Sequence, residues 1–246
     1  MPNCNVRRTA HLLPAADAFF FDIDGTLLVT RDLVHWNALH QAMLEVFDVD
    51  TNIEGLSYHG KTDIDILRMA LRRKGVLEDE FCSRLPRALS VVCREVTAHA
   101  QGLEPEVCPA IPEVLTQIKG EHKMLAIASG NLEVVGWHKV SAAGLRNFFS
   151  SGTFGDDCDT RCDISTLAVE SARNRHGSKT SVCFIGDTPD DILAARHVNA
   201  AIIAVATGSF RFEDLAALHP DVCCYNCGEL LVNRALDSSG SLACMS

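Results

Sequence analysis

A short apolar stretch that ends in two closely spaced carboxylates constrains the fold most strongly. Residues 19–28 have the sequence FFFDIDGTLL, in which Asp22 ends the apolar run and Asp24 follows two positions later. The length and phenylalanine content of the run are typical of a buried strand. A carboxylate at the end of a strand lies where open α/β sheets have their ligand crevice. Two such carboxylates can act as a nucleophile and as an acid/base, although an ordinary strand followed by an Asp-Gly turn is also common.

Strand and helix patterns alternate along the chain after residue 105. Strands are expected at residues 123–128, 181–185, 200–206 and 221–225. Helices are expected at residues 111–119, 132–143, 163–175, 190–197, 212–218 and 228–236. This alternation is typical of βαβ units, so we predict an α/β fold with a Rossmann-like parallel-sheet core.

Residues 31–106 depart from this alternation and have helical patterns throughout. Apolar residues recur at helical spacing from Trp36 to Phe47, Thr62 and Asp65 resemble a capping box, and a further helical segment covers residues 79–100. Three helices without an intervening strand favour an inserted domain that covers the carboxyl ends of the strands; the alternative is a set of crossover helices packed on the sheet. The expected parts are a lead-in at 1–16, a core at 17–30 and 107–236, a helical insert at 31–106 and a tail at 237–246.

Charge and apolar content exclude several classes of partner. The formal net charge is −10 and Lys and Arg form no dense cluster, so nucleic acid is not an expected partner. No segment has the ~18 consecutive apolar residues that a membrane span needs, and the N-terminus is typical of neither a secretory nor a twin-arginine signal. We therefore expect a cytoplasmic protein that does not bind membranes.

The 11 cysteines are expected to be reduced thiols, because no secretory signal accompanies them and their number is odd. Cys223, Cys224 and Cys227 suggest a zinc site as an alternative. This alternative carries little weight, since Cys223 and Cys224 lie within a strand-like run and a structural zinc site needs two well-spaced ligand pairs.

Polar residues follow three of the predicted strands. They are Asp22 to Thr26, Ser129 to Asn131, and Gly186 to Asp191, and the loop at 155–161 adds further acidic residues. In a parallel sheet these strand ends converge on one edge. Carboxylates from two strands would create a strongly negative site, which is tolerable when a hard cation lies between them. Mg²⁺ suits oxygen ligands and keeps positions open for water and a substrate phosphate.

These motifs, in this order and spacing, resemble those of the haloacid dehalogenase superfamily of phosphohydrolases. The resemblance covers nearly all of residues 18–232, and the helical insert is similar to the α-helical cap of that family. Asp22-x-Asp24-Gly25-Thr26 matches the first motif, Ser129 the second, and Gly186-Asp187 with Asp191 the fourth. Residues 59–63 (HGKTD) and 205–208 (VATG) are similar to the phosphoglycolate phosphatase and β-phosphoglucomutase-like branch.

The third motif departs from the family pattern, which has a Lys at this place. Residues 156–167 offer Arg161 and no Lys, and a guanidinium can also neutralise a phosphate and bind it bidentately. Lys139 and Lys179 are possible substitutes. Both are less well placed, because Lys139 lies in the middle of a helix and Lys179 precedes a strand at its far end.

The resemblance implies a role for each matching position. Asp22 would attack phosphorus and form an aspartyl phosphate, and Asp24 would act as the acid and then as the base. Mg²⁺ would be held by Asp22, Asp24 through its backbone carbonyl, Asp187 and Asp191. The phosphate-binding residues would be Thr26, which also orients Asp24, together with Ser129, Gly130, Asn131 and Arg161. Lys61 would contact an anionic group of the substrate or would equally be a surface residue.

The resemblance therefore implies a magnesium-dependent phosphatase that acts on a small phosphorylated metabolite, as a monomer or homodimer. An acid/base carboxylate at position 24 favours phosphatases and mutases over dehalogenases, because a halide leaving group needs no proton. Two alternatives stay open. A phosphosugar mutase uses the same motifs, and a non-catalytic binding protein can have the same fold.

Overall fold

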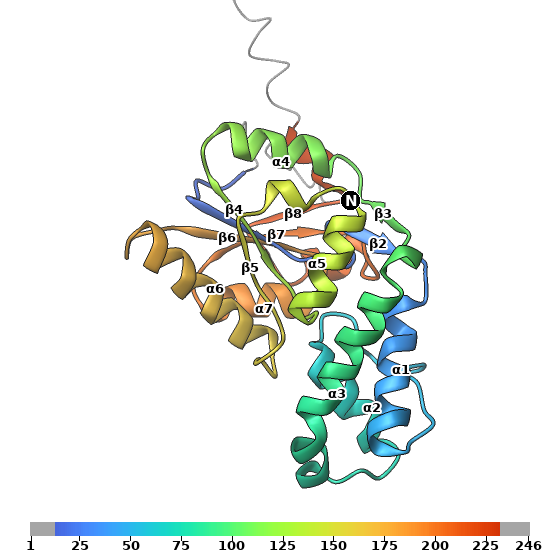
Figure 1. Cartoon of the computed structure of the whole chain (residues 1–246). Helices are drawn as coiled ribbons and strands as arrows, with labels where there is room; N and C mark the ends of the chain where they lie inside the picture. The colour runs from blue at the N-terminus through green and yellow to red at the C-terminus, as the bar shows by residue number, and fades with distance from the viewer. Residues whose placement is uncertain (1–12, 232–246) are drawn as a thin grey trace, which may run out of the picture.

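A six-stranded parallel sheet forms the centre of the computed structural model, which describes residues 13–231 (Figure 1). The strand order is β5-β4-β1-β6-β7-β8, so the first strand lies in the middle of the sheet. The strands are β1 (Ala18–Phe21), β4 (Met124–Ala128), β5 (Ser151–Thr153), β6 (Val182–Gly186), β7 (Ala201–Val205) and β8 (Val222–Cys224). All neighbouring strands in this sheet pair in parallel, which confirms the predicted fold class.

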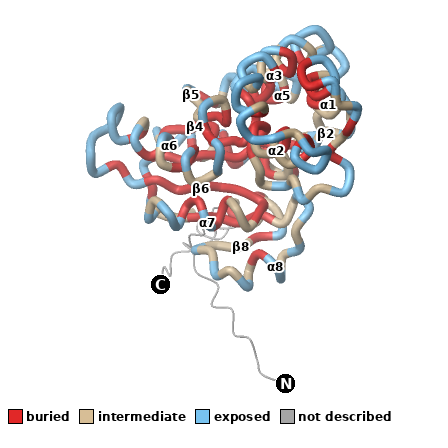
Figure 2. The backbone as a smooth tube through the Cα atoms, turned by 90° about the horizontal axis from the view of Figure 1, so that it is seen from below, coloured by how far each residue is buried: buried red, intermediate tan, exposed pale blue. Residues whose placement is uncertain are grey.

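Helices cover both faces of the sheet. One face packs against α4 (Ile111–Gly120), α5 (Glu133–Ala142) and the 3₁₀ helices η2 (Arg146–Phe148) and η3 (Cys227–Leu231). The other packs against α6 (Arg161–His176), α7 (Pro189–His197) and α8 (Phe212–Ala216). Phe19 and Phe21 of β1 face the first layer and Phe20 faces the second, as the two-residue period of a strand requires. The four central strands, β4, β1, β6 and β7, are therefore buried on both sides (Figure 2), which explains their continuous apolar sequences.

The helical insert has a hydrophobic core of its own. It consists of α1 (Val34–Phe47), α2 (Asp63–Arg72), α3 (Glu78–Ala98) and the short 3₁₀ helix η1 (Ala100–Gly102). The chain enters and leaves it through β2 (Leu28–Thr30) and β3 (Pro105–Val107), which pair antiparallel. Thr62 caps α2 by accepting a hydrogen bond from the Asp65 backbone N–H at 3.1 Å. The predicted α/β core with an inserted α-helical cap is thus the observed architecture.

Several local expectations differ from the structure. The segment between α1 and α2 is not helical, and β5 was not predicted because its residues are only Ser, Gly and Thr. The last predicted helix is the 3₁₀ helix η3, and residues 232–236 of that prediction lie outside the described residues, as do residues 1–12 and the tail at 237–246. No helix within residues 13–231 combines the length and the apolarity needed to cross a membrane.

Candidate active site

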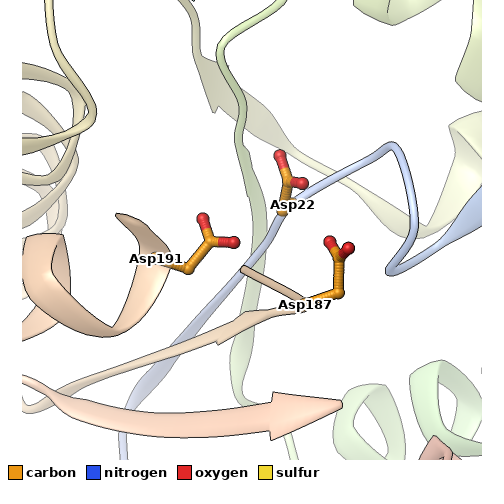
Figure 3. Close-up of side chains that lie close together, drawn as sticks. All are labelled: Asp22, Asp187 and Asp191. Carbon is orange, nitrogen blue, oxygen red and sulfur yellow. The ribbon is translucent and has the colours of Figure 1, made fainter. Parts of the chain in front are cut away.

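Three buried carboxylates meet at the carboxyl edge of the sheet. Asp22 follows β1, Asp187 follows β6, and Asp191 lies in the first turn of α7. The register that pairs Phe21 with Ile185 brings these strand ends together. One oxygen from each carboxylate lies within 4.8 Å of the others, and Figure 3 shows the three side chains gathered around the end of β1. Within residues 13–231, this is the group of acidic, histidine and cysteine side chains that could hold a metal ion.

Residues 25 and 26 hold Asp187 in place. The Thr26 hydroxyl donates a hydrogen bond to Asp187 Oδ1 at 3.1 Å. This contact corrects the expectation that Thr26 orients Asp24. Gly25 has φ +85°, and a Cβ atom on Gly25 or on Gly208 would collide with the Asp187 carboxylate. These glycines therefore leave the space that the carboxylate occupies.

Asp191 and Arg161 come from the first turns of two adjacent helices. Asp191 Oδ2 accepts hydrogen bonds from the Thr188 backbone N–H and hydroxyl in a capping box, which leaves Oδ1 to accept one from Arg161. A second capping box, between Thr160 and Asp163, begins α6 at Arg161. Arg161 Nη1 also donates to Asp22 Oδ1 at 3.0 Å. The structure thus brings Arg161 into the carboxylate cluster, with further N–H groups available for a ligand.

Lys139 also lies in the site, which corrects the expectation that a mid-helix lysine is poorly placed there. Its side chain is 3% exposed, and Nζ contacts both oxygens of Asp24 at 2.9 and 2.7 Å and Asn131 Oδ1 at 2.8 Å. Lys139 lies on the buried face of α5, four residues after Val135. This spacing is the sequence signal that could have identified it, because residues four apart share one helix face. Lys179 lies beyond the opposite end of the sheet, just before β6.

The loop after β4 supplies the remaining polar groups and contacts the cap. Asn131 Nδ2 donates to Asp24 Oδ2 at 2.7 Å and to Ser129 Oγ at 3.0 Å. The Gly130 carbonyl accepts a hydrogen bond from the Asp63 backbone N–H at 2.9 Å, and Asp63 Oδ2 accepts one from the Leu132 backbone N–H at 2.8 Å. Ser129, Gly130 and Asn131 therefore lie together at the site, where α2 meets the loop.

Lys61 is already paired with a carboxylate of the core. Its Nζ lies 2.7 Å from Asp190 Oδ2, and both side chains are about one third exposed. Lys61 lines the same cavity as the candidate catalytic residues. A substrate anion would have to compete with Asp190 for this ammonium.

Burial and charge shift the pKa values of the site carboxylates in opposite directions. Burial, assisted by Asp191 and Asp24 and opposed by Arg161, raises the pKa of Asp22 to about 6. Burial and the charges of Asp22 and Asp191 raise the pKa of Asp187 well above its ordinary value. Burial also acts to raise the pKa of Asp24, but the charge and hydrogen bonds of Lys139, with those of Asn131, outweigh it and lower this pKa.

The charges of the site favour a divalent cation. Four carboxylates (Asp22, Asp24, Asp187 and Asp191) face two cations (Lys139 and Arg161), so two negative charges remain unbalanced. The available ligand atoms are all oxygens, the type that Mg²⁺ and Ca²⁺ prefer. The raised pKa values of Asp22 and Asp187 reflect the same surplus of negative charge, which a metal ion would remove.

Comparisons with known proteins identify the family. Residues 19–205 match the family of haloacid dehalogenase-like hydrolases. The chain is 26% identical over 216 residues to phosphoglycolate phosphatase of Agrobacterium fabrum, covering 85% of this chain and 88% of that protein. It is 27% identical over 147 residues to the probable phosphatase IndB of Dickeya dadantii. This match covers 59% of this chain and 63% of that protein, so the chain spans less than two thirds of the length of IndB.

The fold has solved counterparts. The structure of CbbY from Rhodobacter sphaeroides in complex with phosphate superposes with a TM-score of 0.66 at 19% identity, covering 87% of this chain and 96% of that one. This likeness supports the fold, and the sequence match spans most of the core and all of the cap. The chain therefore belongs to the haloacid dehalogenase-like hydrolase family.

Proposed function

We propose that this hydrolase is a magnesium-dependent phosphatase that cleaves a small phosphomonoester through an aspartyl phosphate on Asp22. The observation that carries the proposal is the cluster of Asp22, Asp187 and Asp191 oxygens beside Arg161, with Asp24 at the same cavity. The names of the two relatives, both phosphatases, support the reaction type.

The residues present fit a hard metal ion. The Asp22, Asp187 and Asp191 carboxylates and the Asp24 backbone carbonyl would hold Mg²⁺, which when bound neutralises charge on the phosphoryl oxygens. Arg161 keeps N–H donors for the same oxygens, because its two hydrogen bonds to Asp22 and Asp191 use only part of its guanidinium. The Ser129 hydroxyl and the backbone N–H groups of Gly130 and Asn131 complete the phosphate-binding set.

The chemistry proceeds in two displacements. In the first, an Asp22 oxygen forms a bond to phosphorus while the bond to the ester oxygen breaks, and Asp24 donates its proton to that leaving oxygen. In the second, a water oxygen attacks phosphorus and the bond to Asp22 breaks, while Asp24 takes the proton from the water. The products are the alcohol and inorganic phosphate, and both aspartates return to their starting forms.

Asp24 must gain a proton before the first displacement, although Lys139 holds its pKa low in the free protein. A phosphate group that binds beside Asp24 adds negative charge, and a neighbouring like charge raises the pKa of a carboxyl group. Substrate binding would therefore oppose the effect of Lys139 and favour protonation of Asp24. Lys139 and Asn131 hold the ionised Asp24 in place by hydrogen bonds to its two oxygens.

Small phosphorylated metabolites are the proposed substrates and the cytoplasm the proposed location, with a monomer or homodimer as the working form. The name of the Agrobacterium relative refers to phosphoglycolate, and CbbY has been crystallised with xylulose-1,5-bisphosphate as well as with phosphate. The nine cysteines within residues 13–231 are free thiols, which is consistent with a reducing compartment.

Phosphate release from a generic aryl phosphate, measured with and without Mg²⁺, tests the proposal. We expect turnover that depends on Mg²⁺ and is lost in Asp22→Asn, with a ³²P-labelled phosphoenzyme formed only by the wild type. Transfer of the label to a second position of a sugar phosphate, without phosphate release, would instead indicate a mutase. A folded wild-type protein that neither releases phosphate nor becomes labelled would refute a phosphotransfer function.

A further inference from the structure

The cavity above the catalytic residues is much larger than a phosphate group. It has a volume of about 560 Å³, in the range of pockets that bind whole small molecules. Its floor holds Asp22, Asp24 and Arg161, and its upper wall comes from the cap and the chain segments that lead to it. The alcohol part of the substrate, which leaves on the side of Asp24, must therefore occupy this upper part.

The upper wall combines polar and charged residues with apolar ones, and it contains two aromatic rings. The apolar and aromatic residues that line it are Val29, Leu33, Trp36, Leu39, Ile53, Tyr58 and Ile66. Trp36 and Tyr58 contact each other edge-to-face, with ring centroids 6.3 Å apart, and neither is fully buried. Trp36 lies in the first turn of α1 next to His35, which is close enough to Asp24 to affect its pKa. Both rings therefore line the cavity that the leaving group enters.

Each lysine and arginine that lines the cavity already has a carboxylate partner. Lys61 pairs with Asp190 at 2.7 Å and Arg31 with Glu106 at 2.9 Å. At the floor, Lys139 pairs with Asp24, and Arg161 pairs with Asp22 and Asp191. A carboxylate or second phosphate in the upper part would therefore meet cations whose charge is already offset by a neighbouring carboxylate. It would also lie near the Asp32 and Asp63 carboxylates, which line the same cavity.

We propose, on the basis of the phosphatase function above, that the substrate is the phosphomonoester of a neutral alcohol that carries a flat ring. The ring would lie against Trp36 and Tyr58. Phosphorylated acids and bisphosphates would be poor substrates, in contrast to the substrate after which the Agrobacterium relative is named. Selection by charge follows from the Lys61–Asp190 pair, and selection by shape from the aromatic wall.

Matched esters test the two parts of this proposal separately. Benzyl phosphate and 4-carboxybenzyl phosphate have similar leaving groups but differ by one carboxylate, and ethyl phosphate lacks the ring. With Mg²⁺, we expect kcat/KM for benzyl phosphate to exceed that for each of the other two esters by about tenfold or more. Phosphoglycolate hydrolysed as fast as benzyl phosphate, or faster, would overturn the proposal while leaving the phosphatase function intact.

Two variants assign the selectivity to residues. Trp36→Ala should remove most of the advantage of benzyl over ethyl phosphate, whereas Trp36→Phe should retain it. Ethyl phosphate turnover shows whether each variant is folded, because this ester does not reach the ring. Asp190→Asn, which frees Lys61, should raise the ratio of 4-carboxybenzyl to benzyl phosphate turnover about fivefold or more. Unchanged ratios in both variants would overturn the assignment.

Equilibrium binding separates a failure of this inference from a failure of the phosphatase function. Benzylphosphonate and 4-carboxybenzylphosphonate cannot be hydrolysed at their P–C bonds, so calorimetry with Mg²⁺ measures recognition without turnover. Suppose that no ester is hydrolysed but benzylphosphonate binds about tenfold more tightly than 4-carboxybenzylphosphonate. The phosphatase function then fails and the proposed ligand class holds. Equal or reversed affinities would overturn the ligand class.

Discussion

Replacing Lys139 by methionine tests whether this buried lysine acts on catalysis through Asp24. An ammonium group has three N–H donors, and the three short contacts of Lys139, to both Asp24 oxygens and to Asn131, use all of them. No donor remains for a substrate phosphate. Lys139→Met should raise the pKa of Asp24 but also remove the group that holds it in position, so we expect a loss of turnover with little loss of substrate affinity.

The structure sets the size of the effect on stability. Removing one partner of a buried ion pair costs about 3–5 kcal/mol when both partners are buried. Here the Lys139 side chain is 3% exposed but that of Asp24 is 40% exposed, so water in the cavity can solvate the carboxylate that remains. We expect a loss of about 1–2 kcal/mol in the free energy of unfolding. This corresponds to a fall of about 2–8 °C in Tm for a chain of this size.

The activity assay compares two leaving groups. An alkoxide needs the proton of Asp24 and 4-nitrophenolate does not, so kcat/KM should fall about 100-fold for an alkyl phosphate and clearly less for 4-nitrophenyl phosphate. Lys119→Met is the matched control, because Lys119 is an exposed lysine on α4. Equal losses for the two esters, or a raised KM with unchanged kcat, would refute the positioning role and indicate direct phosphate binding by Lys139.

Three further predictions concern the metal site. Gly208→Ala places a Cβ atom against the Asp187 carboxylate and should weaken Mg²⁺ activation about tenfold or more, measured as the metal concentration for half-maximal activity; an unchanged value would contradict the collision. In EDTA, the Tm of the wild type should fall relative to that of Asp22→Asn as pH rises from about 4 to 7. The reason is that Asp22, with a pKa of about 6 in the folded state, binds more protons there than in the unfolded state. A parallel pH dependence of the two Tm values would exclude the raised pKa. Inorganic phosphate should bind measurably by calorimetry only when Mg²⁺ is present, and equal affinity without metal would refute the charge balance given above.

The sequence predicted those parts of the fold whose signals are local. Residues 19–21 and 182–185 are apolar because both faces of the sheet are covered, and Thr62 begins a helix where its side chain accepts a hydrogen bond. β5 gave no such signal. It is a three-residue edge strand whose pairing with β4 comes from the parallel register and not from its own side chains.

The candidate site was predicted where carboxylates directly follow strands and was incomplete where distant side chains pair. Asp22 and Asp187 could be placed together because parallel strand ends converge. The partner of Lys61 could not be found, since Asp190 lies 129 positions away and in the core. Lys139 did carry a signal, as a lysine on the apolar face of α5, but the pattern alone does not show which carboxylate it meets.

The charge arrangement separates the chemistry of this site from its selectivity. At the floor, two negative charges remain after Lys139 and Arg161 are counted. Binding of a divalent cation therefore favours binding of a phosphate dianion, and the reverse must hold to the same extent. In the upper wall Lys61 and Arg31 are paired with Asp190 and Glu106, so the rings of Trp36 and Tyr58 are the groups that distinguish one alcohol from another. Changes in the cap can therefore alter which ester binds without altering the carboxylates that act on phosphorus.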